Sequence, residues 1–219
     1  YRYNSSAIRD YMVSRSGHSV IRVTEKKPKK KGKKKKKSSA LGLPAVAPFA
    51  ASDSSSVLAA NEDPYNQTCL KDRTYTAARI TRCVYYDTAI DGLVVVDKVK
   101  ALKRIRADQR WQVPNGVTVS TRSNGATLTS PNASATMLFT GGGAVRKYRP
   151  SSKRQDGWFT NGYGELVKGT TLQRGATIAK GKKRTWISVL AAGETAPSVS
   201  LTDGVVSVTR KQTDTFPLP

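Results

Sequence analysis

From residue 75 onward, the chain is a succession of short segments that favour β-strands. "ARITRCV", "GLVVVDKV" and "SATMLFT" are rich in β-branched and other apolar side chains, and the turn sequences "PNG", "NG" and "GGG" separate such segments. Roughly ten segments follow one another at intervals of about 8–12 residues. We see no long segment with the periodicity of an amphipathic helix. The sequence therefore predicts an all-β protein, an antiparallel β-sandwich or a barrel.

Four segments carry more specific expectations. Val94, Val95 and Val96 form the most apolar run, so we expect them to be fully buried. "GVTVSTRS" ends at Asn-Gly, which predicts a hairpin. We also expect the glycines at 141–143 to close a hairpin, since no helix follows that would make them a phosphate-binding loop. The segment "DGWFTNGYGE" is expected to be a loop.

The chain divides into three parts by composition. Residues 1–24 contain the alternating segment "HSVIRV", which predicts a strand beginning at Val20 and Ile21 and the start of the sandwich. Residues 25–56 hold a lysine run and an Ala/Pro/Ser-rich stretch, and these are typical of a solvated flexible insertion and linker. Residues 57–219 are predicted to form the main β-sandwich.

The chain is strongly basic, with a formal net charge of +23 over 219 residues. Ten lysines lie within residues 26–37, and without them the charge is still 23 − 10 = +13. Such a charge favours polyanionic partners, which include nucleic acid, anionic lipid headgroups and acidic polysaccharides. No apolar run approaches the length of a membrane span, so we expect no membrane insertion.

One feature concerns the origin of the chain. It begins at Tyr1, without an initiator Met or a signal sequence, so we expect a mature product or a piece of a longer chain.

Its two cysteines, Cys69 and Cys83, give no zinc signature. They form either one disulfide in an exported protein or two buried thiols, and the spacing leaves both open.

His18 is the only histidine of the chain, and it precedes the first predicted strand. Arg9, Tyr11 and Arg15 lie just upstream, so this segment is rich in groups that bind anions and transfer protons. The competing interpretation is a surface residue at the basic edge of a strand.

The order of these motifs resembles the C-terminal region of heparinase II/III-like polysaccharide lyases. "YRYNSSAIRDYMVSRSGHSVIRV" is similar to the family's Arg/Tyr-rich stretch that leads to a His-Asn-Thr-Val strand, which reads His-Ser-Val-Ile here. "ARITRCVYYDTAIDGLVVVDKVKA" looks like its paired strands. "QRWQVPNGVTV" and "DGWFTNGYGELVKGTTL" resemble its Trp-containing strand and its Gly-Trp…Tyr-Gly loop.

The resemblance implies an antiparallel β-sandwich that packs on an N-terminal α/α toroid, which is not in this chain and is expected as a separate chain or fragment. It also implies β-elimination on heparan sulfate, hyaluronan, chondroitin or alginate, in a secreted or periplasmic protein. By position, His18 matches the sandwich histidine and is the expected catalytic residue. Arg9, Tyr11 and Tyr75 are the expected substrate-binding residues.

The resemblance also bears on cofactors. Some members bind zinc through two histidines and an aspartate, and calcium is a second possibility. Here the second histidine position carries Thr81, and the candidate carboxylate, Asp53, lies in the insertion. The set of metal ligands is therefore incomplete. The resemblance allows zinc or calcium, but the sequence assigns no cofactor.

Two non-enzymatic alternatives remain open. A lysine-rich segment ahead of a β-rich domain is typical of viral capsid proteins, in which lysines neutralise nucleic-acid phosphates. A carbohydrate-binding module without catalysis is the other alternative.

Overall fold

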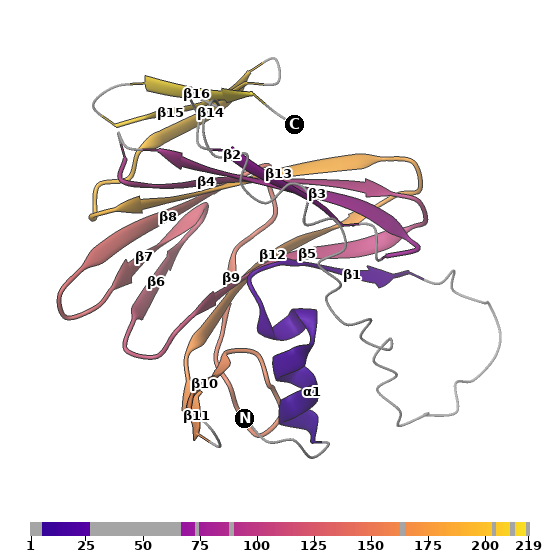
Figure 1. The fold of residues 1–219 in the computed structure, drawn as a ribbon, viewed down its shortest axis with the longest axis vertical. Coiled ribbons are helices and arrows are strands. Elements are labelled where there is room, and N and C mark those ends of the chain that lie inside the picture. The colour runs from indigo at the N-terminus through magenta and orange to yellow at the C-terminus, as the bar shows by residue number, and fades with distance from the viewer. Residues whose placement is uncertain are drawn as a thin grey trace.

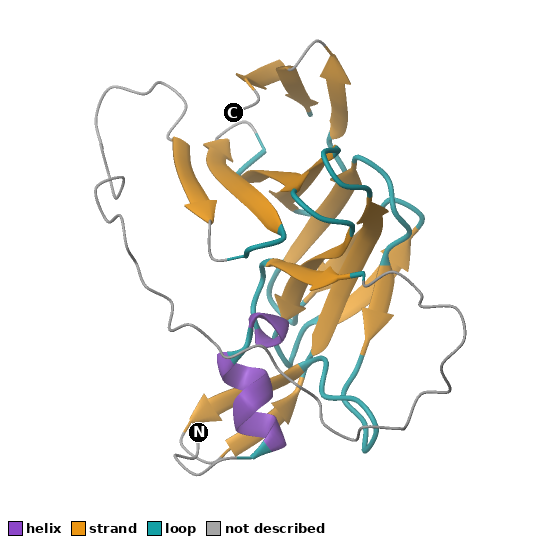
Figure 2. Cartoon of the chain, turned by 90° about the vertical axis from the view of Figure 1, so that its right-hand side faces the viewer, coloured by secondary structure: helices purple, strands orange, loops and turns teal. Residues whose placement is uncertain are grey.

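The computed structural model describes residues 6–26, 67–72, 75–87, 90–162, 165–202, 205–210 and 213–217. Almost all of this part of the chain is antiparallel β-sheet, as the sequence predicted (Figures 1 and 2). One short helix, α1 (Ala7–Val13), and a 3-10 turn, η1 (Arg15–Gly17), precede the first strand. Neither is long and apolar enough to cross a membrane, and the same holds for every helix among the described residues.

A seven-stranded sheet and a four-stranded sheet form the sandwich. The large sheet has the order β2 (Gln67–Asp72), β3 (Ala78–Asp87), β4 (Gly92–Ala101), β13 (Lys183–Ala192), β8 (Ser134–Thr140), β7 (Gly125–Thr129) and β6 (Thr118–Arg122). The small sheet has the order β1 (Ile21–Glu25), β5 (Ile105–Val113), β12 (Thr170–Ile178) and β9 (Arg146–Tyr148). The β4–β5 and β12–β13 turns carry the chain from one sheet to the other at the right-hand end of Figure 1.

A third sheet covers the other face of the large one. It consists of β14 (Ser198–Thr202), β15 (Val205–Thr209) and β16 (Thr213–Pro217), drawn yellow at the top of Figure 1. Val206 and Val208 of β15 pack in one apolar cluster with Tyr85, Val94 and Val96. The central strands are thus buried on both faces, which is why β4 reads as a continuous apolar run and why the prediction for Val94–Val96 is confirmed.

The opposite face of the large sheet packs against the small sheet. Ile80, Val99 and Trp186 meet Ile105 and Ile178 there, and all five side chains are buried. Side chains alternate between faces along each strand, so residues 80, 82 and 84 of β3 point toward the small sheet and residues 79, 81 and 83 point away. This alternation separates the two sides of the molecule that are considered below.

Polar side chains also cross the space between the two sheets. The carboxylate of Asp97 accepts hydrogen bonds from Arg82 (2.7 and 2.8 Å) and from Gln109 Nε2 (2.6 Å). Gln109 Oε1 in turn accepts from Arg174 Nε at 2.6 Å. Burial lowers the pKa of the Arg174 guanidinium, the charge of Asp97 opposes this shift, and the nearby positive charge of Arg184 adds to it. The chain of bonds ties β3 and β4 to β5 and β12.

A disulfide joins Cys69 on β2 to Cys83 on β3, so the two cysteines are bonded to each other and are not free thiols. The two residues are directly opposite one another in the register of these strands. This pairing closes a loop with a sequence separation of 14.

Two turn predictions need correction. Gly141–Gly143 does not close a hairpin, because β8 before it and β9 after it belong to different sheets. All three glycines have positive φ, and a Cβ at Gly141 would lie 2.3 Å from Thr185 O. The segment expected to be a loop forms a hairpin of β10 (Trp158–Gly162) and β11 (Glu165–Lys168).

The other predictions on organisation fare differently. The hairpin at Asn124 is confirmed, with Arg122 opposite Gly125, so Ser123 and Asn124 are its two turn residues. Strand β1 begins at Ile21 and extends to Glu25. Residues 27–66, which include most of the expected insertion, lie outside the described residues, and the division into three parts stays a prediction.

Candidate functional site

The segment around His18 turns sharply between helix α1 and strand β1. The helix begins with Ser6 as N-cap, whose side chain accepts from Arg9 N–H at 3.2 Å. It ends at Ser14, whose hydroxyl donates to Tyr11 O (2.8 Å) and accepts from Ser16 N–H (3.1 Å). Gly17 packs against the helix, where a Cβ would lie 2.8 Å from Tyr11 O. Only glycine fits without a shift, and His18 follows directly. We call residues 14–19 the His18 loop.

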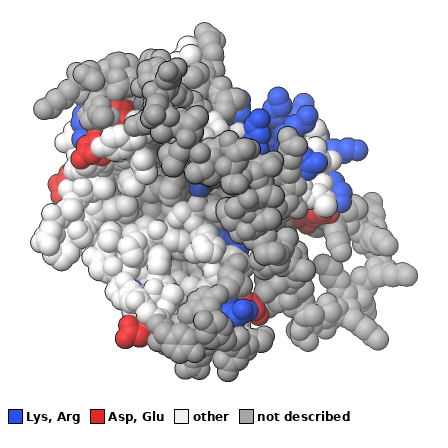
Figure 3. All heavy atoms as spheres, viewed as in Figure 1, with Lys and Arg blue, Asp and Glu red and all other residues white. Residues whose placement is uncertain are grey.

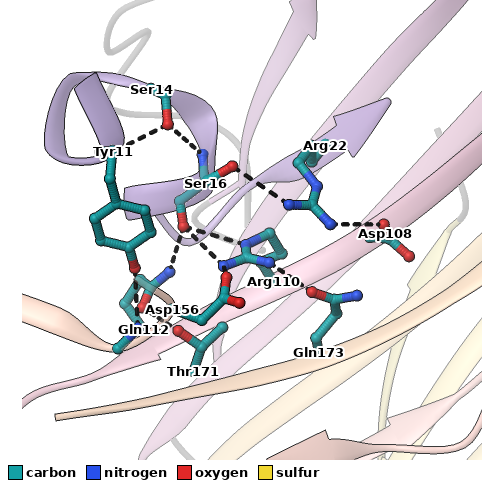
Figure 4. A network of polar contacts seen from close by, with 11 residues as sticks. Tyr11, Ser14, Ser16, Arg22, Asp108, Arg110, Gln112, Asp156, Thr171 and Gln173 are labelled. Atoms are coloured by element: carbon teal, nitrogen blue, oxygen red, sulfur yellow. Dashed lines mark hydrogen bonds and ion pairs between the residues drawn. The ribbon is translucent and has the colours of Figure 1, made fainter. Parts of the chain in front are cut away.

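Two long side chains of β5 hold the middle of this loop (Figure 4). The carbonyl oxygen of Ser16 accepts from Arg110 Nε (3.2 Å), from Arg110 Nη2 (2.9 Å) and from Gln112 Nε2 (2.9 Å). Arg110 is fully buried, pairs with Asp156 and donates to Gln173 Oε1. Since a buried cation with several partners has one favourable position, the carbonyl that it binds is also fixed.

The end of the loop is anchored just as closely. Ser19 Oγ accepts from the backbone N–H of Gln112 at 2.9 Å, and Ser19 O accepts from Arg82. Arg82 rests on the ring of Trp111, with 5.3 Å from the guanidinium carbon to the ring centroid. The residues on both sides of His18 are therefore tied to the sandwich.

The side chain of His18 itself is exposed, and its backbone is extended. A proton-transferring group that acts on a large polymer needs this combination of a held backbone and an accessible ring. The catalytic role of His18 stays a prediction.

The three expected substrate-binding residues lie close to the loop but differ in setting. Arg9 is half-buried on α1. Tyr11 is buried, and its hydroxyl accepts from Gly157 N–H at 3.0 Å. The half-buried Tyr75 accepts from Val23 N–H (3.3 Å) and donates to Ile21 O (3.4 Å). Both tyrosine hydroxyls thus have structural partners, and a role in substrate contact stays a prediction for all three.

Sequence reasoning missed the polar face of the small sheet on which the loop lies. Arg106, Asp108, Arg110 and Gln112 alternate along β5 and point away from the large sheet. Asp108 accepts from Arg106 (2.8 Å) and from Arg22 of β1 (3.1 Å), so one carboxylate faces two guanidinium groups. The alternation of polar residues in "IRADQRWQV" was the available signal. Around Asp108 the two partly exposed guanidinium groups outnumber the one carboxylate.

A hollow of about 470 Å³ lies where β12 begins and β9 ends. Arg149 and Lys168 are among its lining residues, together with Pro114, Gly116 and Thr118. Two cations and small neighbouring side chains leave room for an anionic group beside the polar face.

The described residues do not fit a zinc or calcium site. Within the described ranges, no three His, Cys, Asp or Glu side chains come together. Thr81 lies on the face of β3 that points away from the small sheet, and Asp53 lies outside the described residues. We derive no metal-dependent step.

The chain is similar to known proteins both in sequence and in fold. The family model for "Heparinase II/III-like, C-terminal" matches residues 1–204. The fold is similar to that of heparan sulfate lyase HepC from Pedobacter heparinus, with a TM-score of 0.57 and 14% identity over 72% of this chain and 27% of that one. It is also similar to a solved heparinase III gene product, with a TM-score of 0.54 and 16% identity over 70% of this chain and 26% of that one. No curated protein matches. The chain thus spans about a quarter of the length of these lyases.

Proposed function

This chain belongs to the heparinase II/III-like family, whose C-terminal domain it matches, and we propose that it is the β-sandwich part of a lyase that cleaves acidic polysaccharides by β-elimination. The observation that carries the proposal is the His18 loop: an exposed imidazole between two residues that Arg110, Gln112 and Arg82 hold in place. The polar face of the small sheet beside it supports an acidic polymer as the substrate.

The proposed chemistry needs groups of this kind. A base removes the proton at C5 of the uronic acid, the electron pair forms the C4–C5 double bond, and the bond from C4 to the glycosidic oxygen breaks. A proton then neutralises the leaving oxygen. His18 exchanges one of these protons, since an imidazole serves as base or acid near neutral pH. A cation or hydrogen-bond donor near the uronic acid stabilises the negative charge that develops on its carboxylate.

The remaining groups come from the proposed toroid partner, because the resemblance to the family implies that the toroid supplies the other catalytic residues. We also propose that the protein is exported, secreted or periplasmic, and the Cys69–Cys83 disulfide supports an oxidising compartment.

The test is an ultraviolet assay for unsaturated uronate. The natural protein, with anything that co-purifies, is offered heparan sulfate, hyaluronan, chondroitin and alginate. We expect product from one of them and none with His18→Ala, while Thr24→Ala, an exposed change on the adjoining strand, retains activity. Circular dichroism checks that both variants are folded. No product from any polymer, with an intact toroid partner present, would reject the lyase and leave a binding module or coat protein.

A further inference from the structure

A row of three cations crosses the large sheet on the side that faces away from the small sheet. Arg79 on β3 is directly opposite Lys100 on β4, and Lys100 is directly opposite Lys183 on β13. Neighbouring strands lie about 4.8 Å apart, so the row extends over about 10 Å. All three side chains are exposed. We call them the cation row.

Further positive residues surround the row. Lys98 is two residues from Lys100 on β4, and Lys71 on β2 is opposite Thr81, two residues from Arg79 on β3. Both lysines therefore share the face of the row. The adjoining turns add four more exposed cations: Lys103, Arg104, Lys180 and Lys182. Figure 3 shows Lys and Arg side chains gathered over this end of the sheet. Since the His18 loop lies against the small sheet, the cation row is on the other side of the large sheet from it.

The ion pairs among the described residues leave the row un-neutralised. They join Arg22 and Arg106 to Asp108, Arg82 to Asp97, Arg110 to Asp156 and Lys103 to Glu25. Arg79 donates to two backbone carbonyls, of Tyr75 and Ala78, and so keeps its charge. Like charges directly opposite one another on a sheet are destabilising. A bound polyanion would remove this repulsion.

We propose that the cation row is a second binding surface for an acidic polysaccharide, separate from the elimination site. The position and charge of the cation row do not depend on the proposed function. The choice of a polysaccharide as its partner rests on that function. Such a surface holds a polymer to the protein while another part of the same polymer reaches the His18 loop, which raises the effective concentration at the second site.

The chemistry of the surface favours a polysaccharide over nucleic acid. Single-stranded nucleic acid is held by aromatic side chains that stack on its bases, and the residues of this surface are lysines, arginines and threonines. Sulfate and carboxylate groups project from a sugar chain, so a flat row of cations meets them without stacking. Duplex DNA, which also presents anions on its outside, serves as the competing probe.

The test neutralises the three cations of the row and compares this variant with a control in which three other exposed cations are neutralised. The variant is Arg79→Gln/Lys100→Gln/Lys183→Gln, and the control is Arg122→Gln/Arg146→Gln/Lys153→Gln, three exposed cations elsewhere. Both are made in full-length His18→Ala protein, which under the proposed function does not degrade the probe. Both are repeated with the ten lysines of residues 26–37 changed to Gln, because those lysines also attract polyanions.

Binding of a heparin oligosaccharide and of duplex DNA is measured at about 0.15 M salt, where surface charges are partly screened. We expect the row variant to bind heparin about tenfold more weakly than the control, since each exposed contact adds only a small share. We also expect heparin to raise the melting temperature less in the row variant. Equal heparin affinity of the two variants would overturn the proposal, as would tighter row-dependent binding of DNA than of heparin. Row-dependent heparin binding, combined with no unsaturated product from the protein that retains His18 and has its toroid partner in the ultraviolet assay, would reject the proposed lyase alone.

Discussion

Both carboxylate oxygens of Asp97 accept hydrogen bonds from Arg82, at 2.7 and 2.8 Å, and the same guanidinium binds the carbonyl oxygen of Ser19. Asp97 is fully buried between the two sheets, and Ser19 ends the loop that carries His18. A buried ion pair of the core therefore also sets the position of the candidate catalytic loop. Changes in the core and changes in the loop are expected to affect one another.

Replacing Asp97 is expected to destabilise the fold strongly. Asp97→Asn removes the charge that balances Arg82 and, at longer range, Arg174. Breaking a fully buried ion pair costs about 3–5 kcal/mol, and because Arg82 is partly exposed the loss here is expected at the lower end of that range. The free energy of unfolding in urea measures this loss. Glu25→Gln, which breaks the exposed pair with Lys103, is the control and should cost less than about 1 kcal/mol. Equal costs would contradict the role assigned to the buried pair.

The hydroxyl of Tyr11 is expected to matter for stability. Tyr11→Phe leaves the buried N–H of Gly157 without its acceptor, at a cost of about 1–3 kcal/mol. Thermal and urea unfolding report the change. Tyr86→Phe removes an exposed hydroxyl that donates to Asp91, and it should leave the free energy of unfolding almost unchanged. A Tyr11→Phe protein as stable as the wild type would show that water satisfies this N–H.

Tyr86 gives a prediction on pH. Its hydrogen bond to Asp91 and the charge of that carboxylate raise the pKa of Tyr86 above its ordinary value of 10.0. The folded state thus favours the protonated phenol, and this contribution is present below the ordinary pKa and is lost as pH rises through the raised one. Carbon-13 NMR of the labelled tyrosine ring follows its titration. Asp91→Asn should bring the pKa of Tyr86 down, and an unchanged titration would exclude Asp91 as the cause.

Reduction of the disulfide is expected to weaken the β2–β3 pair. A cross-link over 14 residues restricts the unfolded chain and is worth about 3 kcal/mol. Thermal unfolding with and without dithiothreitol measures the effect. A Cys69→Ala/Cys83→Ala protein serves as control, because reductant should leave its melting temperature unchanged. A wild-type protein that is equally insensitive would mean that the cross-link adds nothing to stability.

Several features of the fold were predictable because neighbouring residues determine them. The β-branched run at Val94–Val96 has no polar residue to face water, so burial on both sides followed from composition. The hairpin at Asn124 was predictable because its turn has only two residues, so the local sequence specifies it. Turn prediction was wrong at Gly141–Gly143, because positive φ at these glycines is equally suited to a hairpin and to a crossing between sheets.

The sequence by itself determined the strand-rich character of the chain, its excess of positive charge and the single histidine that is the candidate catalytic residue. Only the tertiary structure decided what surrounds that histidine. Arg110 is 94 residues from the Ser16 carbonyl that it binds, and the three members of the cation row come from three separate strands. Such contacts depend on strand order and register, which arise when distant segments bury their apolar faces together, and no local pattern specifies them.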